Sequence, residues 1–284
     1  MDAFVPDPPG PLRYNFIRHG LRLVTRCFLR VRLENERQLP PAGPFVLCFS
    51  HPNWVDPLLV IGFWPDRRWV YIFGPKEIDM RAGWRNRLIT WGRIGVPFKP
   101  SKKELLKTTR RALSVLEKGH ILGVAGEGRL SDREGAIVPL EDGPAFLALR
   151  AGVPLVPLAV IGTRWLRFGG RVVLRFGPAL STAGRRPDRE NVADLTIELT
   201  RAMEALLVGV VEQPPPGRIW RWLTDIFNER PWLAEQAAEI AETAETAEIA
   251  ETAEGDAGAE PTVAAEPTVA AEPAVSVRSP NGQH

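Results

Sequence analysis

Two groups of polar residues directly follow predicted β-strands, and their side chains suit proton transfer and anion binding. In the first group, His-Pro-Asn-Trp-Val-Asp, Asp56 lies five residues after His51, and both follow the apolar run 45–49. A carboxylate beside a histidine can orient the imidazole and stabilise its charged form, which leaves the other ring nitrogen free to take a proton. A bare His-x4-Asp spacing also arises by chance, and Asp56 before Pro57 fits the N-cap of a helix, so the pair needs support from its surroundings.

The second group, Gly-Glu-Gly-Arg at residues 126–129, follows the apolar run 121–125. Its glycines allow the backbone to approach a ligand, and Arg129 offers a planar fork of donors to phosphate oxygens. The segment lacks the lysine and hydroxyl of a P-loop, and the chain has no Gly-x-Ser-x-Gly elbow, so nucleotide hydrolysis and serine-hydrolase chemistry lose support. An ordinary polar turn is the alternative interpretation of this segment.

Five short apolar runs rich in β-branched and aromatic residues predict the strands that position these groups. Helical patterns at 101–119 and 192–210 separate or follow them. This alternation predicts an α/β fold with a largely parallel or mixed sheet flanked by helices. In a parallel sheet both polar groups lie at the carboxyl edge, where open α/β sheets bind ligands. The predicted strands are 45–49, 69–73, 121–125, 155–161 and 172–176.

Charge is divided unevenly along the chain. Residues 234–284 hold eleven acidic residues and one arginine, a net charge of −10, and because the whole chain carries +2, residues 1–233 carry +12. The acidic segment consists of short Ala/Glu and Pro/Thr/Val/Ala repeats without an aromatic residue, so it cannot bury a core. We therefore expect a folded domain at 1–233 and a disordered acidic tail at 234–284. The basic domain favours anionic partners, but no reading motif or stacking platform indicates nucleic acid.

An amphipathic helical pattern covers about residues 12–31. Arginines recur every fourth residue along one face, and branched or aromatic residues lie on the opposite face. Helices of this kind lie in membrane interfaces with their arginines near anionic head groups. A helix packed on a soluble core shows the same two faces, so the pattern leaves both alternatives open. The arginines are Arg18, Arg22, Arg26 and Arg30, and the apolar residues are Ile17, Leu21, Val24, Phe28 and Val31.

Cysteine usage and hydropathy disfavour several classes of protein. Cys27 and Cys48 show no metal-ligand spacing and cannot build a disulfide framework, so we expect no metal site and a reducing compartment. The apolar stretch 153–162 is interrupted by prolines and is shorter than the roughly 20 residues of a transmembrane helix. The amino-terminal residues lack the charged and apolar regions of a signal peptide. We expect a peripheral protein on the cytoplasmic side of the membrane.

Four blocks together resemble the phospholipid/glycerol acyltransferases, the family of bacterial lysophosphatidate acyltransferase. The block around His51 and Asp56 resembles the catalytic His-x4-Asp block, and residues 92–99 resemble the second block, which contacts the acceptor. Glu-Gly-Arg at 127–129 resembles the block that contacts phosphate, and 152–163 resembles the proline-containing block that lines the substrate region. The likeness covers roughly residues 12–210, and four blocks in order are more specific than any one of them.

The chain departs from the family pattern in two blocks. The third block usually reads Phe-Pro-Glu-Gly-Thr-Arg-Ser, whereas here Ala125 and Gly126 precede Glu127, and Arg129 comes one place early. The second block usually ends in arginine, and Lys99 is the nearest cation here. A lysine meets phosphate as a point charge rather than as a bidentate fork. These departures leave the identity of the acceptor open.

The resemblance implies an O-acyltransferase of phospholipid biosynthesis. It would move a fatty acyl group from acyl-CoA or acyl carrier protein, as co-substrate, to the hydroxyl of 1-acyl-glycerol-3-phosphate, and no further cofactor is implied. His51 would be the general base, oriented by Asp56. The residues implied to bind substrate are Asn53, Lys99, Glu127, Gly128 and Arg129.

The implied partners are the membrane lipid surface, a lysophospholipid acceptor and the thioester donor. Two alternatives remain open from the sequence. The first is an acyltransferase for another lysophospholipid or for a glycolipid. The second is a membrane-associated lipid-binding protein that keeps the fold without catalysis, which the altered second and third blocks motivate.

Overall fold

The structure is a computed structural model of the 284-residue chain, and it describes residues 11–76, 91–98, 105–128, 130–131, 134–217, 221–222 and 224. The chain divides into two units, Met1–Glu229 and Arg230–His284. All described residues belong to the first unit. The predicted disorder of the tail at 234–284 and the predicted cap of a helix at 101–104 lie outside the described residues.

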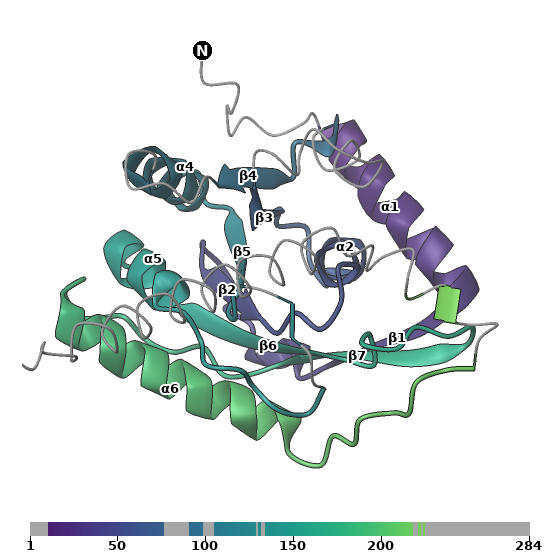
Figure 1. Cartoon of the computed structure of the whole chain (residues 1–284). Helices are drawn as coiled ribbons and strands as arrows, with labels where there is room; N and C mark the ends of the chain where they lie inside the picture. Colours follow the sequence, from purple (N-terminus) through teal and green to yellow (C-terminus); the bar gives the residue numbers. More distant parts are fainter. Residues whose placement is uncertain are drawn as a thin grey trace, which may run out of the picture. The chain divides into compact units, whose positions relative to one another are not determined.

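A mixed seven-stranded sheet forms the centre of the first unit, in the order β1-β7-β6-β2-β5-β3-β4 (Figure 1). Strands β6, β2, β5, β3 and β4 run parallel to one another. Strand β7 is antiparallel to β6 and parallel to the edge strand β1. The strands are β1 (Leu29–Glu34), β2 (Val46–Phe49), β3 (Val70–Lys76), β4 (Gly95–Phe98), β5 (Ile121–Ala125), β6 (Leu155–Ile161) and β7 (Gly170–Phe176).

Helices cover both faces of the sheet, which gives three layers (Figure 1). On one face pack α1 (Pro11–Phe28) and α2 (Asp56–Phe63). On the other face pack α4 (Leu105–Glu117), α5 (Gly143–Ala151) and α6 (Arg189–Leu207). A short 3-10 helix, η1 (Glu36–Gln38), follows β1. Because the sheet is buried on both faces, its central strands are almost continuously apolar rather than alternating.

The predicted α/β fold is confirmed, and all five predicted strands are present with ends shifted by at most three residues. The prediction missed the two edge strands, β1 and β4. The expected helix at 12–31 is wrong at its end, because α1 stops at Phe28 and the chain enters β1. Residues 29–34 alternate apolar and charged side chains, which suits a strand, and they pair in parallel register with β7.

Helix α1 turns part of its predicted apolar face to the core, because Leu21 packs there beside Ile17, whereas Val24 of the same face is exposed. Tyr14 and Ile17 are buried, as an amphipathic core helix requires. The arginine side also faces the protein, since Arg18 Nη2 donates a hydrogen bond to the Trp64 carbonyl at 2.5 Å. The Arg22 guanidinium lies 5.4 Å from the centre of the Phe63 ring, within cation–π range. The arginines of the predicted stripe are therefore partly used for packing α1 on α2.

Tyr14 makes the most specific contact between α1 and the sheet, and its hydroxyl offers a test of this packing. The Val70 amide donates a hydrogen bond to that hydroxyl at 3.1 Å, and the Tyr14 ring stacks on Trp69 at 4.6 Å. Burial raises the pKa of Tyr14 to about 12. Tyr14→Phe keeps the ring but removes the acceptor of a buried amide, so we expect a loss of about 1–3 kcal/mol in the free energy of unfolding.

Urea unfolding of the full chain measures this loss, with Leu12→Ala as the control, because Leu12 on the same helix is 85% exposed. An exposed substitution changes stability by about 0.5 kcal/mol or less. Equal stabilities of Tyr14→Phe and the wild type would show that the Val70 amide does not depend on the hydroxyl.

Candidate active site

His51 and Asp56 form a hydrogen-bonded pair at the carboxyl end of β2. His51 Nδ1 lies 3.0 Å from Asp56 Oδ2, and the edge of the Phe49 ring packs against the imidazole. A carboxylate oxygen only accepts, so Nδ1 donates this bond and Nε2 of a neutral imidazole is left without a proton. The His51 side chain is 15% exposed, whereas Asp56 is fully buried. This arrangement can remove a proton from a hydroxyl that approaches Nε2.

The Asp56 carboxylate is bound by residues of the loop that precedes it. Oδ2 accepts a hydrogen bond from the Asn53 amide at 2.7 Å as well as the bond from His51. The predicted N-cap role of Asp56 is wrong: Val55 occupies the cap of α2, and Asp56 is the first helical residue. The short loop folds back so that the buried charge meets two donors, which a solvent-facing cap would not provide.

Burial raises the pKa of Asp56 above its ordinary value of 3.8. The hydrogen bond and charge of His51 and the hydrogen bond from the Asn53 amide act in the opposite direction. Desolvation is the larger effect, since it disfavours the charged form of any buried carboxyl group. Burial of the ionised carboxyl group therefore costs free energy of folding. The same buried charge strongly stabilises a positive charge on its neighbour His51.

Asn53 is buried inside the loop and bonded within the protein. Its side-chain Nδ2 donates to the Thr163 carbonyl at 2.9 Å, and its Oδ1 accepts from the Val55 amide at 3.0 Å. The resemblance implied contact between Asn53 and substrate, but its exposed fraction is 0%. The hydrogen bonds give Asn53 a role in positioning the loop, and its contact with substrate stays a prediction.

Glu127 and Gly128 lie beside the pair, as the convergence of parallel strand ends predicts. They follow β5, which neighbours β2, and the Ser131 amide after them donates to the His51 carbonyl at 2.8 Å. Glu127 is buried, and Gly128 has a left-handed φ of 63°. The structure therefore brings together His51, Asp56, Asn53, Glu127 and Gly128, whereas Lys99 and Arg129 lie outside the described residues.

Gly126 explains one departure from the family pattern. A Cβ atom at Gly126 would lie 2.6 Å from Cys48 Sγ and 3.0 Å from a methyl carbon of Leu140, which is closer than real contacts allow. The buried Cys48 side chain thus occupies the space that a proline at position 126 would need. The glycine in this block therefore fits the packing around Cys48, and Glu127 lies next to it in the same turn after β5.

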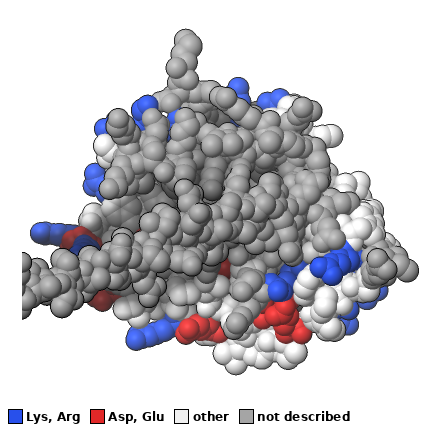
Figure 2. All heavy atoms as spheres, in the orientation of Figure 1, with Lys and Arg blue, Asp and Glu red and all other residues white. Residues whose placement is uncertain are grey.

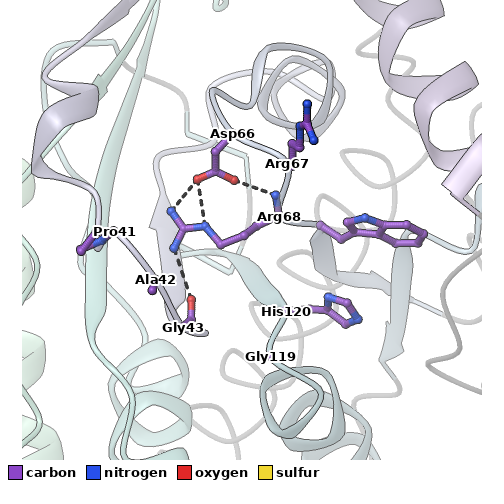
Figure 3. A pocket seen from close by; sticks show the side chains of 9 residues that line it. Pro41, Ala42, Gly43, Asp66, Arg67, Arg68, Gly119 and His120 are labelled. Carbon is purple, nitrogen blue, oxygen red and sulfur yellow. Dashed lines mark hydrogen bonds and ion pairs between the residues drawn. The ribbon is translucent and has the colours of Figure 1, made fainter.

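A separate concave region lies at the opposite edge of the sheet, where β2, β3 and β5 begin (Figure 3). It has a volume of about 550 Å³, and none of the predicted site residues lines it. Its main charges are paired: Arg68 Nη2 lies 2.5 Å from Asp66 Oδ2, and its Nη1 donates to the Gly43 carbonyl. His120, whose pKa is lowered by burial and by Lys118, also lies there. The His51–Asp56 pair lies at the other edge of the sheet.

Among the residues that the structure describes, the charged side chains outside the His51–Asp56 region are spread over the surface. In Figure 2 the described Lys and Arg residues lie around the rim of the visible face rather than in one patch. Among the described residues, no three His, Cys, Asp or Glu side chains gather closely enough to hold a metal ion. Nor does any helix in the described part of the chain have the length and apolar character needed to cross a membrane.

Sequence reasoning missed Glu134, which is buried behind the pair. One of its carboxylate oxygens accepts hydrogen bonds from the Gly162 and Thr163 amides at the end of β6, the second at 3.0 Å. Its partners are backbone groups 28 and 29 residues later in the chain. No side-chain motif marks such a contact, and only a Glu before Gly135 in a polar loop could have hinted at a turn.

Comparisons with known proteins agree with this geometry. A family model described as Acyltransferase matches residues 30–161. The 1-acyl-sn-glycerol-3-phosphate acyltransferase of Bacillus subtilis (strain 168) is 25% identical over 199 residues, which are 68% of this chain and 96% of that protein. The 1-acyl-sn-glycerol-3-phosphate acyltransferase alpha of Mus musculus is 26% identical over 170 residues, which are 56% of this chain and 58% of that protein.

One solved structure supports the fold. The 1-acyl-sn-glycerophosphate (LPA) acyltransferase PlsC from Thermotoga maritima matches with a TM-score of 0.54 and 21% sequence identity. The match covers 71% of this chain and 82% of that chain. The shared architecture is therefore the layered α/β fold described above.

The raised pKa of Asp56 predicts how stability depends on pH. A carboxyl group whose pKa is higher in the folded state binds more protons when folded, so its contribution to stability falls as pH rises from 3.8 toward the raised value. Asn at this position does not titrate. We therefore expect Asp56→Asn to lose less stability than the wild type over that pH window, as measured by urea unfolding at a series of pH values. Parallel stability curves for the two proteins would show that Asp56 keeps an ordinary pKa.

Proposed function

We propose that this chain, which an Acyltransferase family model matches over residues 30–161, moves a fatty acyl group from a thioester donor, acyl-CoA or acyl carrier protein, to the hydroxyl of 1-acyl-glycerol-3-phosphate. The observation that carries this proposal is the 3.0 Å bond between His51 Nδ1 and Asp56 Oδ2 at the carboxyl end of β2. It leaves one ring nitrogen for a substrate proton, which is what an acyl acceptor with an unactivated hydroxyl requires.

His51 acts as the general base. Nε2 takes the proton from the acceptor hydroxyl as its oxygen attacks the thioester carbonyl, and the new C–O bond forms. The C–S bond then breaks, and the proton passes from His51 to the departing thiolate, so that the ester and the free thiol are the products. The buried Asp56 carboxylate stabilises the imidazolium between these two steps and keeps the ring oriented.

The acceptor's polar head is held beside the pair. Glu127 and Gly128 line the loop after β5, and Arg129 and Lys99 are the cations that the family resemblance assigns to the phosphate. A phosphate carries charge that two cations neutralise more fully than one. The co-substrate thioester brings the acyl group, and no cofactor enters this scheme.

Replacing the base tests this mechanism. His51→Gln keeps a polar side chain but removes the proton acceptor, so we expect kcat/KM with lysophosphatidate to fall by about 10² to 10⁴, the usual contribution of general base catalysis. The matched control is His120→Gln, because His120 lies at the opposite edge of the sheet and packs between Trp69 and Tyr71.

A thiol-release assay with purified full-length proteins, with folding checked by circular dichroism, gives the result. Turnover by folded His51→Gln at the wild-type rate would sink the mechanism. A wild-type protein that releases no thiol with lysophosphatidate but does so with another lysophospholipid or a glycolipid would move the proposal to that acceptor. If the protein released no thiol with any of these acceptors but still bound vesicles, the result would favour lipid binding without catalysis.

We further propose that the outward face of α1 binds the membrane that contains the acceptor. Leu12, Phe16 and Leu23 are 85%, 71% and 69% exposed, and their spacing places all three on one side of the helix. Exposed apolar side chains clustered on one helix face are typical of interfacial binding. This face differs from the one that the arginine spacing indicated.

Aromatic and basic side chains border this face. Phe16 meets Trp91 edge to face at 6.3 Å, and the Arg13 guanidinium lies 4.6 Å from the centre of the Trp91 ring. Aromatic rings suit the head-group region, and exposed arginines attract anionic lipids. Since Cys27 and Cys48 are free thiols, as in a reducing compartment, we place the protein on the cytoplasmic side of that membrane.

Acidic substitutions on the outward face of α1 test the membrane proposal. The double variant Phe16→Glu with Leu23→Glu puts two carboxylates where apolar groups would enter the lipid, so we expect at least a tenfold loss of binding to vesicles of anionic phospholipid, because each added charge costs more than the roughly 1.4 kcal/mol that corresponds to tenfold. Leu106→Glu is the control, since Leu106 is 69% exposed on α4. Vesicle sedimentation in which both variants bind like the wild type would exclude α1 as the docking face.

A further inference from the structure

Glu134 occupies a turn of backbone amides at the end of β6. Gly162 has a left-handed φ of 88°, and a Cβ atom there would lie 2.1 Å from the Arg171 carbonyl oxygen, so the chain turns tightly against β7. Successive amides in such a turn point toward one place and form a concavity suited to an anion. The Gly162 and Thr163 amides meet there on Glu134 Oε1. A side chain of this protein thus fills an anion-binding turn.

A chain of hydrogen bonds leads from this turn to the catalytic pair. The amide of Thr163 donates to Glu134 Oε1 at 3.0 Å, and the carbonyl of Thr163 accepts from Asn53 Nδ2 at 2.9 Å. The Asn53 amide donates to Asp56 Oδ2 at 2.7 Å, and the same oxygen bonds His51 Nδ1. Thr163, Asn53 and Asp56 are all fully buried, so no bond in this chain is readily replaced by water.

The loop that carries Glu134 also meets His51 directly. The Ser131 amide donates to the His51 carbonyl at 2.8 Å, three residues before Glu134. Ser131 therefore bonds a residue that follows β2, and Glu134 bonds the turn that follows β6, the strand next to β2. A displacement of Glu134 would move Thr163 and, with its carbonyl, the Asn53 side chain that donates to that carbonyl.

The electrostatic interaction between Glu134 and Asp56 also links the turn to the catalytic pair. Burial raises the pKa of Glu134, the three amides of residues 162–164 lower it, and the nearby Asp56 raises it further. The pKa of the Glu134 carboxyl group thus depends on the charge of Asp56 as well as on the amides of the turn. An acceptor oxygen at this position satisfies buried amides that would destabilise the turn if they were left without a partner.

We propose that Glu134 is a positioning residue for acyl transfer, which sets the orientation of His51 through Thr163, Asn53 and Asp56. The proposal rests on the proposed function of His51 as the general base. Glu134 does not touch the reacting atoms. Its effect is to fix which ring nitrogen of His51 carries the proton and where the other nitrogen points.

Substitutions at Glu134 in the full chain distinguish this role from a general contribution to stability. Glu134→Ala removes the acceptor and is expected to lower kcat by about 10- to 100-fold, the usual effect of a lost outer hydrogen bond, with KM little changed. Glu134→Gln keeps an oxygen that can accept both amides and is expected to retain most of kcat. Glu198→Ala is the control, because it removes a carboxylate that is paired with Arg185 on the exposed side of α6.

A double-mutant cycle with Asn53→Ala tests the route. If Glu134 acts through Asn53, the double variant has nearly the kcat of Asn53→Ala alone, whereas independent effects multiply. Folded Glu134→Ala with wild-type kcat, or multiplying effects in the cycle, overturns the proposal. If Glu134→Ala does not fold, Glu134→Asp decides, because its shorter side chain keeps the charge but withdraws the acceptor. A wild-type kcat for that variant overturns the proposal.

The imidazole ¹⁵N chemical shifts of His51 provide a readout that needs no turnover. They report which ring nitrogen carries the proton. We expect one tautomer, protonated at Nδ1, in the wild type and in Glu134→Gln, and a mixture in Glu134→Ala or Glu134→Asp. A protein without acyltransferase activity that shows this change would refute the proposed function alone. Unchanged shifts in Glu134→Ala and Glu134→Asp would refute the positioning role alone.

Discussion

Asp56 is a carboxylate with no exposed surface, and removing such a group from water costs several kcal/mol that its neighbours must offset. The contacts that do so are the Asn53 amide at 2.7 Å and His51 Nδ1 at 3.0 Å. The arrangement of the site depends on this constraint, because a buried acceptor that needs two donors fixes both the loop before α2 and the plane of the imidazole. Catalytic orientation is thus a consequence of satisfying a buried charge.

The fold positions the site by ending three strands at one edge. His51 follows β2, Glu127 follows β5 and Thr163 follows β6, and β2 lies between the other two. Helix α2, which is buried on nearly its whole surface, continues directly from this loop, and Asn53 and Asp56 are fully buried, so water does not compete for their hydrogen bonds. The layered α/β architecture therefore supplies the dry, rigid edge on which a histidine and a carboxylate act as a unit.

The sequence predicts the strand ends well, because apolar runs and the polar residues that follow them are local features. The β5 prediction matches to the residue, and His51, Asp56 and Glu127 converge as expected. Local sequence patterns do not reveal which distant residues a helix face or a buried side chain contacts. The sequence shows which residues of α1 share a face. It does not show that the arginine side contacts the Trp64 carbonyl and the Phe63 ring, because these groups belong to a distant segment. Glu134 bonds backbone amides, which have no side-chain signature.

The most direct test of the account is the turnover number of Asp56→Asn with a thioester donor and lysophosphatidate at saturating concentrations. Asparagine fills the same volume and can still accept from the Asn53 amide, but it cannot stabilise a positive charge on His51. The account predicts a folded protein whose kcat is lower by about 10² or more, the order of effect known when such a carboxylate is neutralised. A folded Asp56→Asn protein with the wild-type kcat would contradict the account, because the buried charge would then have no part in the chemistry.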